Sequence, residues 1–446
     1  MRNRKNTPLA SGRVKVRTGV ALILAGVLAT GCDTSLDLLN PNAPTEAEVL
    51  NNLDGVLALS LGMQEQFAGS ILTYVRAPAL VTDEWGTQTR ALASDQALSA
   101  GGAIDPSFLV VSAPYFATYR VARSANNILA ATPTLGLAPG LERGLTSTAR
   151  LFKAMALGMA AMHYQRLPLD AAFEGAPLVP RAEAFAEVIR LLEAARADLQ
   201  GVTDAELTTF RNRGLTPNFD LRNTIDAMLA RYYLISGQNQ QALTAANRVN
   251  LNSVSVFTYP DPNRNPINNY AFGALYVAPL QSFVTEAEAG DMRVPFWVNT
   301  AATPFVGNPP IPLLPFQMFS GRNDVFHVYL PGEIMLIKAE AQARLDQLAE
   351  ARTQINLVRT KAPVGTVPGA VGALPGAQLP ALTAEQLPDL NSILRQIAYE
   401  RRYELFSQGL RWEDLRRLGA QAGRQPRSAF LPIPEPECRS NPNAGC

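Results

Sequence analysis

A helical period of apolar residues, repeated many times, most constrains how this chain of 446 residues can fold. Apolar side chains spaced three and four residues apart lie on one face of an α-helix, and such a helix must bury that face against a neighbour. The pattern is clear between residues 185 and 199, and similar segments follow further along the chain. The sequence therefore predicts a mostly α-helical fold. The apolar face of this segment consists of Phe185, Val188, Ile189, Leu192, Ala195 and Leu199.

Two further regions each contain a pair of such segments joined by a turn of only two or three residues. In residues 225–249 the turn lies at Ser236 and Gly237, and residues 334–358 repeat the arrangement. Short turns make neighbouring helices antiparallel, and alanines where the helices cross let their backbones approach closely. Both units resemble tetratricopeptide hairpins.

Long stretches rich in proline, glycine and asparagine separate these hairpins, at residues 201–222, 251–330 and 362–388. The 33 prolines of the chain indicate rigid loops that interrupt the helices. A regular solenoid has no such gaps. We therefore predict a single domain over residues 45–446, in which tetratricopeptide-like helical hairpins form a scaffold and long loop insertions pack on one side of it.

The first 31 residues are predicted to be a signal peptide that is removed. Six basic residues between Arg2 and Arg17 precede an aliphatic run over Val20–Ala29, and no acidic residue occurs before Asp33. Ten helical residues span about 15 Å, roughly half of a hydrocarbon core, which is typical of a signal peptide and too short for a stable membrane span. No later stretch approaches about 18 continuous apolar residues, which argues against a transmembrane anchor.

The aliphatic run ends in a segment, Leu28 to Cys32, that resembles a bacterial lipobox. A lipobox usually has leucine three residues before the cysteine, whereas Ala29 holds that position here and Leu28 lies one residue earlier. We predict cleavage before Cys32 and attachment of lipid to Cys32; an ordinary signal peptide with an incidental cysteine is the alternative. Residues 32–44 are polar and contain proline, so they are predicted to form a flexible tether that reaches up to about 40 Å when extended.

The cysteine count fits this interpretation. The chain has three cysteines, and an odd number in an exported protein normally leaves one thiol to explain. If lipid occupies Cys32, Cys438 and Cys446 can form a disulfide across a short loop, worth roughly 2–3 kcal/mol at best in an oxidising compartment. Two free thiols on a frayed C-terminal tail are the alternative.

Composition excludes several classes of function. A net charge of +1 with 17% charged residues gives no support for nucleic-acid binding. Two histidines, His163 and His327, are too few and too far apart for a metal site, and no common hydrolase or phosphate-binding motif occurs. No cofactor, metal or catalytic residue is predicted. The 38 acidic residues cannot exclude a glycosidase, but nothing singles out a pair of them.

Residues 400–417 read E-R-R-Y-E-L-F-S-Q-G-L-R-W-E-D-L-R-R. This segment closely resembles the C-terminal signature of the SusD/RagB family of lipoproteins, E-R-x-x-E-L-x-x-E-G-x-R-W-x-D-L-x-R. It departs from that pattern at Gln408, where the family usually has glutamate. Five other blocks resemble the family's motifs in the same order, so the resemblance spans the mature chain. They lie at residues 119–129, 149–179, 227–234, 333–359 and 430–442.

The signature residues are interpreted as structural. On a helix, Arg401 and Glu404, or Glu404 and Gln408, lie on one face and can satisfy polar groups where the helix meets the scaffold. Gly409 is expected to end that helix or to allow a close backbone approach. A catalytic pair formed by Glu400 and Glu404 is the less favoured alternative.

The resemblance implies capture of a nutrient. SusD-like proteins lie on the outer face of the outer membrane against a TonB-dependent, SusC-like β-barrel transporter, and they hold an oligosaccharide or a peptide before import. Asp33 directly after the lipidated cysteine favours inner-membrane retention by the rules of enteric bacteria, but the resemblance argues for the cell surface. A helical scaffold or lid that mainly engages protein partners, and a lipid-anchored hydrolase, are the alternatives.

Binding of sugar requires flat aromatic faces against pyranose rings and nearby planar polar groups that bond hydroxyls. Such residues should lie in the loops outside the hairpins, whereas Trp412 lies in the signature and is predicted to be core. Aromatic residues make up only 7% of the chain, so a non-glycan ligand remains possible. The candidate ligand-binding residues are Trp85, Arg90, Trp297, Tyr259, Asn263 and Tyr270.

Overall fold

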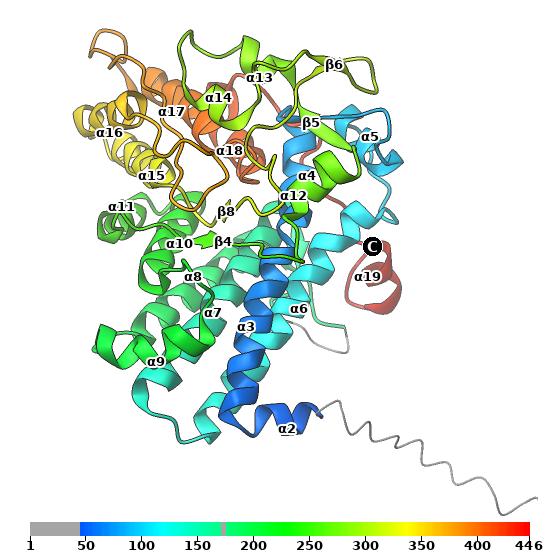
Figure 1. The fold of residues 1–446 in the computed structure, drawn as a ribbon, viewed down its shortest axis with the longest axis vertical. Coiled ribbons are helices and arrows are strands. Elements are labelled where there is room, and N and C mark those ends of the chain that lie inside the picture. Colours follow the sequence, from blue (N-terminus) through cyan, green and yellow to red (C-terminus); the bar gives the residue numbers. More distant parts are fainter. Residues whose placement is uncertain (1–44, 171–174) are drawn as a thin grey trace, which may run out of the picture. The chain divides into compact units, whose positions relative to one another are not determined.

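The computed structural model describes residues 45–170 and 175–446 (Figure 1). The predicted signal peptide, Cys32 and the tether over residues 32–44 lie outside the described residues. Residues 47–446 form one compact unit. In the part of the chain that is described, no helix is both long and apolar enough to cross a membrane.

The N-terminal part of this unit is helical. A single helix from Glu46 to Gly62 is expected from the sequence, but the structure breaks it after Leu50, because the Asn52 side chain accepts a hydrogen bond from the backbone N–H of Gly55 and caps a new helix. The elements in this part are α2 (Glu46–Leu50), α3 (Leu53–Gly69), α4 (Ile71–Val81), α5 (Ala93–Ala100), α6 (Leu109–Ala131), η1 (Thr132–Thr134) and α7 (Pro139–His163).

The two predicted hairpins are confirmed. The first turns at Gly237, with φ of +75°, and the second at Asp346, with φ of +62°. Other helices pack beside them, so the mostly α-helical fold class predicted from the sequence is also confirmed (Figure 1). The hairpins are α10 (Leu221–Ile235) with α11 (Asn239–Arg248) and α15 (Pro331–Arg344) with α16 (Leu348–Thr360); the neighbouring helices are α8 (Arg181–Asp198), α9 (Asp204–Gly214), α17 (Leu390–Glu404) and α18 (Arg411–Leu418).

Short strands and helices occupy the long loops. The described strands pair only as two-stranded antiparallel ribbons, β1 (Trp85–Thr87) with β5 (Val277–Pro279), β2 (Arg166–Leu167) with β3 (Val179–Pro180), β4 (Val256–Phe257) with β8 (Phe326–His327), and β6 (Phe305–Val306) with β7 (Pro312–Leu313). In Figure 1 β5, β6, α13 and α14 of the 251–330 insertion lie toward the end of the unit opposite α9, whereas β4 and β8 lie near α10. The remaining short elements are α12 (Pro266–Asn268), η2 (Asn269–Gly273), α13 (Gln281–Thr285), α14 (Arg293–Trp297), η3 (Gly419–Ala422) and α19 (Glu435–Ser440).

The signature segment lies in the core. Trp412 is 1% exposed, as predicted. Gly409 has φ of +74°, and a Cβ at this position would lie 3.0 Å from the carbonyl oxygen of Tyr74, so the glycine permits a close backbone approach. The expected ion pairs along the helix are replaced by pairs between elements, since Arg401 bonds Asp414 at 2.8 Å.

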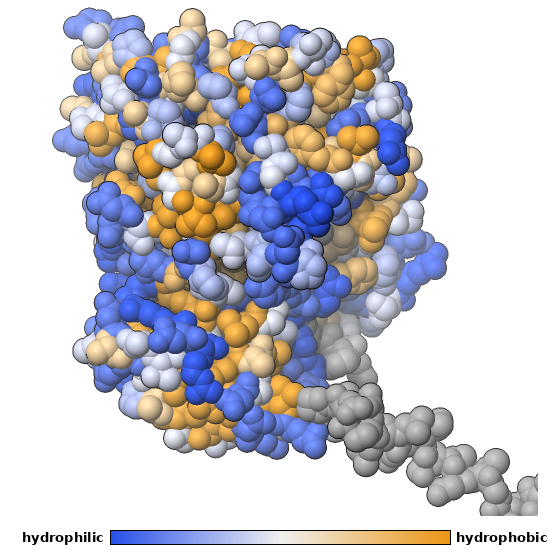
Figure 2. All heavy atoms as spheres, viewed as in Figure 1, coloured by the Kyte–Doolittle hydropathy of each residue, from blue (hydrophilic) through white to orange (hydrophobic). Residues whose placement is uncertain are grey.

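Apolar and hydrophilic residues are interspersed over the face of the molecule seen in Figure 2. Most of the buried apolar residues belong to one large core cluster, whose members extend along the chain from Val56 in α3 to Leu431 near the C-terminus. This shared core holds the loop insertions and the helices together, and it fixes the position of α6 and of the segments around it.

Candidate functional site

Trp85 and Trp297, predicted to face a ligand, lie in the protein core. Both side chains are 0% exposed. The indole Nε1 of Trp85 donates a hydrogen bond to Ser407 Oγ at 2.8 Å, and that of Trp297 donates to the carbonyl oxygen of Tyr403 at 2.8 Å. The Trp85 ring also packs edge-on against Phe316, with centroids 5.5 Å apart. Both tryptophans therefore tie loops to the signature segment and present no open face in this structure.

Tyr259 and Tyr270 are buried as well. The Tyr259 hydroxyl donates to the carbonyl oxygen of Ala68 at 3.0 Å and so joins the loop to the end of α3. The Tyr270 hydroxyl donates to a carboxylate oxygen of Asp95, which also pairs with Arg76. The Arg76 guanidinium lies over the Tyr270 ring, 4.8 Å from its centroid. These contacts give both tyrosines a structural role.

Arg90 and Asn263 are exposed. Within the described residues, no hydrogen bond or ion pair links either of their side chains to the four predicted aromatic residues. The structure therefore does not assemble the six candidates into one site, and their contact with a ligand stays a prediction.

A different region forms a pocket of about 690 Å³. Three walls surround it: the middle of α6, the loop segments 168–170 and 175–176, and α19 with Asn441 near the C-terminus. Gln66 of α3 completes the lining. The lining combines aromatic rings, two arginines, two carboxylates and small polar groups. The lining residues are Gln66, Tyr115, Phe116, Tyr119, Arg120, Arg123, Ser124, Pro168, Asp170, Gly175, Ala176, Glu437, Ser440 and Asn441.

Helical spacing explains how α6 builds one wall. Residues four apart lie above one another on a helix, so this helix presents two adjacent stripes to the pocket. Phe116 is 43% exposed, which leaves a face of its ring available to a ligand. The first stripe is Phe116, Arg120 and Ser124, and the second is Tyr115, Tyr119 and Arg123.

Polar contacts join α6 to the second wall of the pocket, which consists of the loop segments 168–170 and 175–176. Lys153 of α7 is mostly buried, and its ammonium donates to Asn126 Oδ1 at 2.8 Å and to Asp170 Oδ2 at 3.0 Å. Asn126 in turn donates to Asp170 Oδ1 at 2.6 Å. The Tyr119 hydroxyl donates to the carbonyl oxygen of Pro168 at 2.8 Å. Because these bonds cross from helix to loop, they fix the distance between the two walls.

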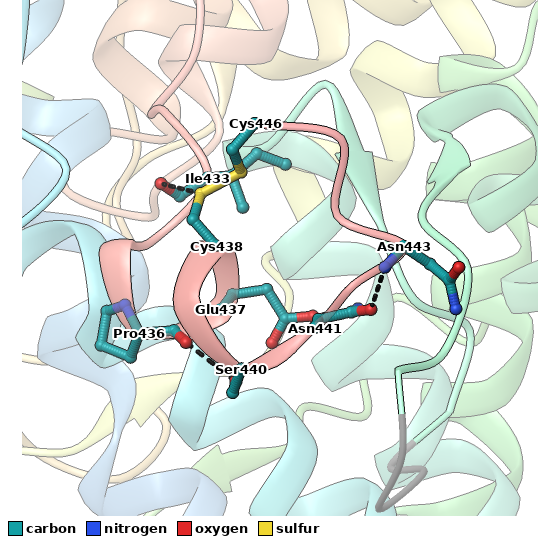
Figure 3. The surroundings of a disulfide bond; sticks show 8 residues. All are labelled: Ile433, Pro436, Glu437, Cys438, Ser440, Asn441, Asn443 and Cys446. Atoms are coloured by element: carbon teal, nitrogen blue, oxygen red, sulfur yellow. Dashed lines mark hydrogen bonds between the residues drawn. A yellow bond between two sulfur atoms is a disulfide. The ribbon is translucent and has the colours of Figure 1, made fainter.

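The third wall is α19, which carries Glu437 and Ser440, together with Asn441 directly after it. A disulfide joins Cys438 to Cys446, and the tail after α19 folds back beside it (Figure 3). The Asn441 amide donates to Glu437 Oε1 at 2.6 Å, so the residue that follows α19 orients this carboxylate.

Burial raises the pKa of the two tyrosines in the pocket, Tyr115 and Tyr119. It raises the pKa of Tyr115, and the nearby negative charge of Glu437 raises it further. Burial likewise raises the pKa of Tyr119, with Tyr115 and Glu437 as further causes. The two rings are 4.7 Å apart. Both hydroxyls are protonated at physiological pH, as in free tyrosine, and that of Tyr119 donates to Pro168.

These groups suit recognition of a ligand. An exposed ring, fixed hydroxyls, guanidinium groups and an amide can hold a ligand with an apolar face and a hydroxyl-bearing edge. The described lining contains no histidine, cysteine or lysine, and the described part of the chain contains no cluster of three or more residues that could hold a metal ion. In the sequence, residues 119–129 stand out only as a family motif. The signal that indicates this wall is the spacing on one helix of Tyr115, Phe116, Tyr119, Arg120 and Arg123.

Comparison with known proteins places the chain by sequence and by fold. Residues 317–429 match the model of the SusD family. No curated protein matches the sequence. The fold is similar to that of a SusD superfamily protein from Bacteroides thetaiotaomicron, with 14% identity, a TM-score of 0.65, and coverage of 88% of this chain and 98% of that one.

Two further similar structures are of proteins described as binding a carbohydrate. A SusD-like carbohydrate binding protein from Bacteroides vulgatus shows 15% identity and a TM-score of 0.64, covering 86% of this chain and 97% of that chain. A laminarin binding SusD-like protein shows 17% identity and a TM-score of 0.61, covering 86% and 96%. The resemblance that the sequence motifs predict is thus confirmed, by sequence over residues 317–429 and by fold over most of the chain.

Proposed function

We propose that this chain, which has the SusD fold and matches the SusD family over residues 317–429, is a substrate-binding lipoprotein that captures an oligosaccharide for import. The pocket between α6 and α19 is the proposed binding site. The observation that carries the proposal is the placement of the half-exposed Phe116 ring beside Arg120 and the polar groups of α19 within one cavity of about 690 Å³.

The chemistry of the pocket matches that of a sugar. The apolar face of a pyranose ring packs against an aromatic ring, while its equatorial hydroxyls accept from guanidinium and amide groups and donate to carboxylates. Phe116 supplies the ring, and Arg120, Ser440 and Asn441 supply polar groups around it. That two proteins of the same fold are described as binding carbohydrate or laminarin supports an oligosaccharide over a peptide as the ligand.

The wider role in uptake is also proposed. The lipid on Cys32 holds the protein on the outer membrane, facing outward, and residues 33–44 act as a leash. A TonB-dependent, SusC-like transporter receives the ligand. Under this proposal, Cys32→Ser leaves the folded unit and its ligand affinity intact but releases the protein from the membrane and abolishes transport. A Cys32→Ser protein that stays membrane-bound in cell fractionation contradicts the anchor.

Calorimetry with the chain over residues 33–446 tests ligand capture. A panel of oligosaccharides and peptides identifies the ligand class, and Phe116→Ala is expected to weaken the tightest ligand by about 5- to 30-fold, since one aromatic contact contributes roughly 1–2 kcal/mol. Leu109→Ala is the matched control, because Leu109 lies on the same helix, is 69% exposed and does not line the pocket. Equal losses in both variants contradict the assignment of the pocket.

The panel also separates the alternatives. Stable association with a β-barrel partner, without binding of any panel member, favours the helical scaffold or lid. Release of a cleaved product from any panel member favours a lipid-anchored hydrolase. Binding without product, and with the loss expected for Phe116→Ala, supports capture.

A further inference from the structure

The third wall of the pocket, α19, is too short to be a stable helix by itself. α19 spans only six residues, Glu435–Ser440, and a helix shorter than about 12 residues is marginal in water by itself. None of its side chains is buried. It nevertheless supplies Glu437 and Ser440 to the pocket. Something outside the helix must therefore fix its position.

The disulfide is placed where it can do so. Cys438 lies in the middle of α19, and Cys446 is eight residues further on. Figure 3 shows the bond closing the tail into a loop against the helix, with Asn441 and Asn443 on the intervening segment. The backbone N–H of Asn441 also donates to the carbonyl oxygen of Glu437 at 2.9 Å, within the same closed loop.

This loop in turn holds the second wall of the pocket. The Asn441 amide donates to the carbonyl oxygen of Ala176 at 2.8 Å, and the Asn443 amide donates to that of Gly175 at 2.5 Å. Gly175 has φ of +60°, and a Cβ there would lie 3.0 Å from Pro442 Cδ. The tail is therefore packed directly on the backbone of residues 175–176, and only glycine fits this contact without strain.

We propose that the Cys438–Cys446 disulfide positions the ligand pocket, by clamping α19 and, through Asn441 and Asn443, residues 175–176. The disulfide-bonded chain then binds its ligand more tightly than the reduced chain. This inference rests on the proposed function for the affinity, but the clamp itself is a property of the chain without ligand. Cys438 and Cys446 are positioning residues, since neither lines the pocket.

The size of the closed loop sets the expected effect. Closing a loop of about nine residues shifts the equilibrium between its ordered and open forms by up to roughly 80-fold on loop-closure entropy. Once the open form is populated, the apparent affinity falls by the fraction of the chain that keeps the pocket assembled. We expect the dissociation constant to rise by at least about fivefold when the disulfide is absent.

Two measurements on the same proteins test this. Amide hydrogen exchange of residues 175–180 and 435–446 is compared between the wild type and the Cys438→Ser, Cys446→Ser double variant, without ligand. Exchange should become faster in both segments and stay unchanged in α10 and α15. Calorimetry with the tightest oligosaccharide of the panel should then show the rise in dissociation constant, while the midpoint of global unfolding falls by at most about 3 °C. Reduction of the wild type should reproduce both effects, and reoxidation should reverse them.

The outcomes are distinct. Unchanged exchange in residues 175–180 shows that the disulfide does not clamp the second wall and overturns the proposal, whatever the ligand. Faster exchange with an unchanged dissociation constant overturns the link to affinity. Failure of the wild type to bind any panel member counts against the proposed function, while the exchange comparison still decides whether the clamp exists.

Discussion

Removal of the Arg293 side chain should destabilise the fold more than any loss of a surface ion pair. Arg293 in α14 donates to Asp291 at 2.9 and 2.6 Å and to Glu400 Oε2 at 2.6 Å. All three side chains are 0% exposed, so water cannot replace the lost bonds. Breaking a buried ion pair by removing one partner costs about 3–5 kcal/mol. Without Arg293 the buried Asp291 carboxylate loses its cation, whereas Glu400 keeps its pair with Arg359 at 2.8 Å. We expect Arg293→Met to lower the free energy of unfolding by about 4 kcal/mol or more.

A second substitution should partly rescue the same variant. Combining Arg293→Met with Asp291→Asn should restore part of the loss, because the buried carboxylate that has lost its cation is then neutral. Glu400 keeps its pair with Arg359 at 2.8 Å in both variants.

Equilibrium urea unfolding followed by tryptophan fluorescence measures these effects, since Trp297 lies four residues from the substitution and is fully buried. Arg190→Met is the matched control: Arg190 pairs with Glu187 along one helix but is 64% exposed, so its loss should cost at most about 1 kcal/mol. A free energy of unfolding for Arg293→Met within about 1 kcal/mol of wild type would refute the view that this cluster holds α14 to the signature helix.

Further substitutions test the two buried titratable groups Glu84 and His327 and the contact between α7 and α10. Burial raises the pKa of Glu84 to about 7, so the folded state holds a proton that the unfolded chain loses above pH 4.5. The free energy of unfolding therefore falls as pH rises from about 4.5 to 7. Glu84→Gln should remove up to about 3 kcal/mol of that fall, measured by urea unfolding at a series of pH values. Burial lowers the pKa of His327 to about 4, so stability is lost as pH falls from 6.5 to about 4, and His327→Phe should make unfolding less sensitive to acid over that window; an unchanged acid profile contradicts the assignment. Gly158→Ala should lower the free energy of unfolding, because its Cβ would lie 2.2 Å from the Tyr232 side chain. Gly62→Ala, whose Cβ meets nothing within 4 Å, should raise the free energy of unfolding by about 0.5–1 kcal/mol. Equal changes in the two variants would contradict the packing of α7 on α10.

The helical hairpins could be predicted from the sequence because their signal is local. The 3.6-residue period of residues 225–249 and 334–358 depends only on which side chains fall on one face of a helix. The break after Leu50 could not be inferred from that period, since it depends on the side chain of Asn52 capping a new helix in place of continuing the old one.

The binding site was harder to predict, because the residues around an aromatic side chain in a loop do not show whether that side chain is buried. Trp85 and Trp297 lie in segments rich in turn residues, which favours exposure, yet both serve as buried links to the signature segment. The pocket is assembled from Gln66 and residues 115–124, 168–170, 175–176 and 437–441, which lie far apart in the sequence. Only tertiary packing brings Phe116 and Glu437 to one cavity, so no single stretch of sequence shows both.

The most direct test of the central claim is a crystal structure of the chain over residues 33–446 with the tightest oligosaccharide of the panel. The account predicts a sugar ring stacked on Phe116, with hydroxyls within hydrogen-bond distance of Arg120 and of α19. Sugar bound instead among the loops around Arg90 and Asn263, with the α6–α19 pocket unoccupied at saturating ligand, would contradict it.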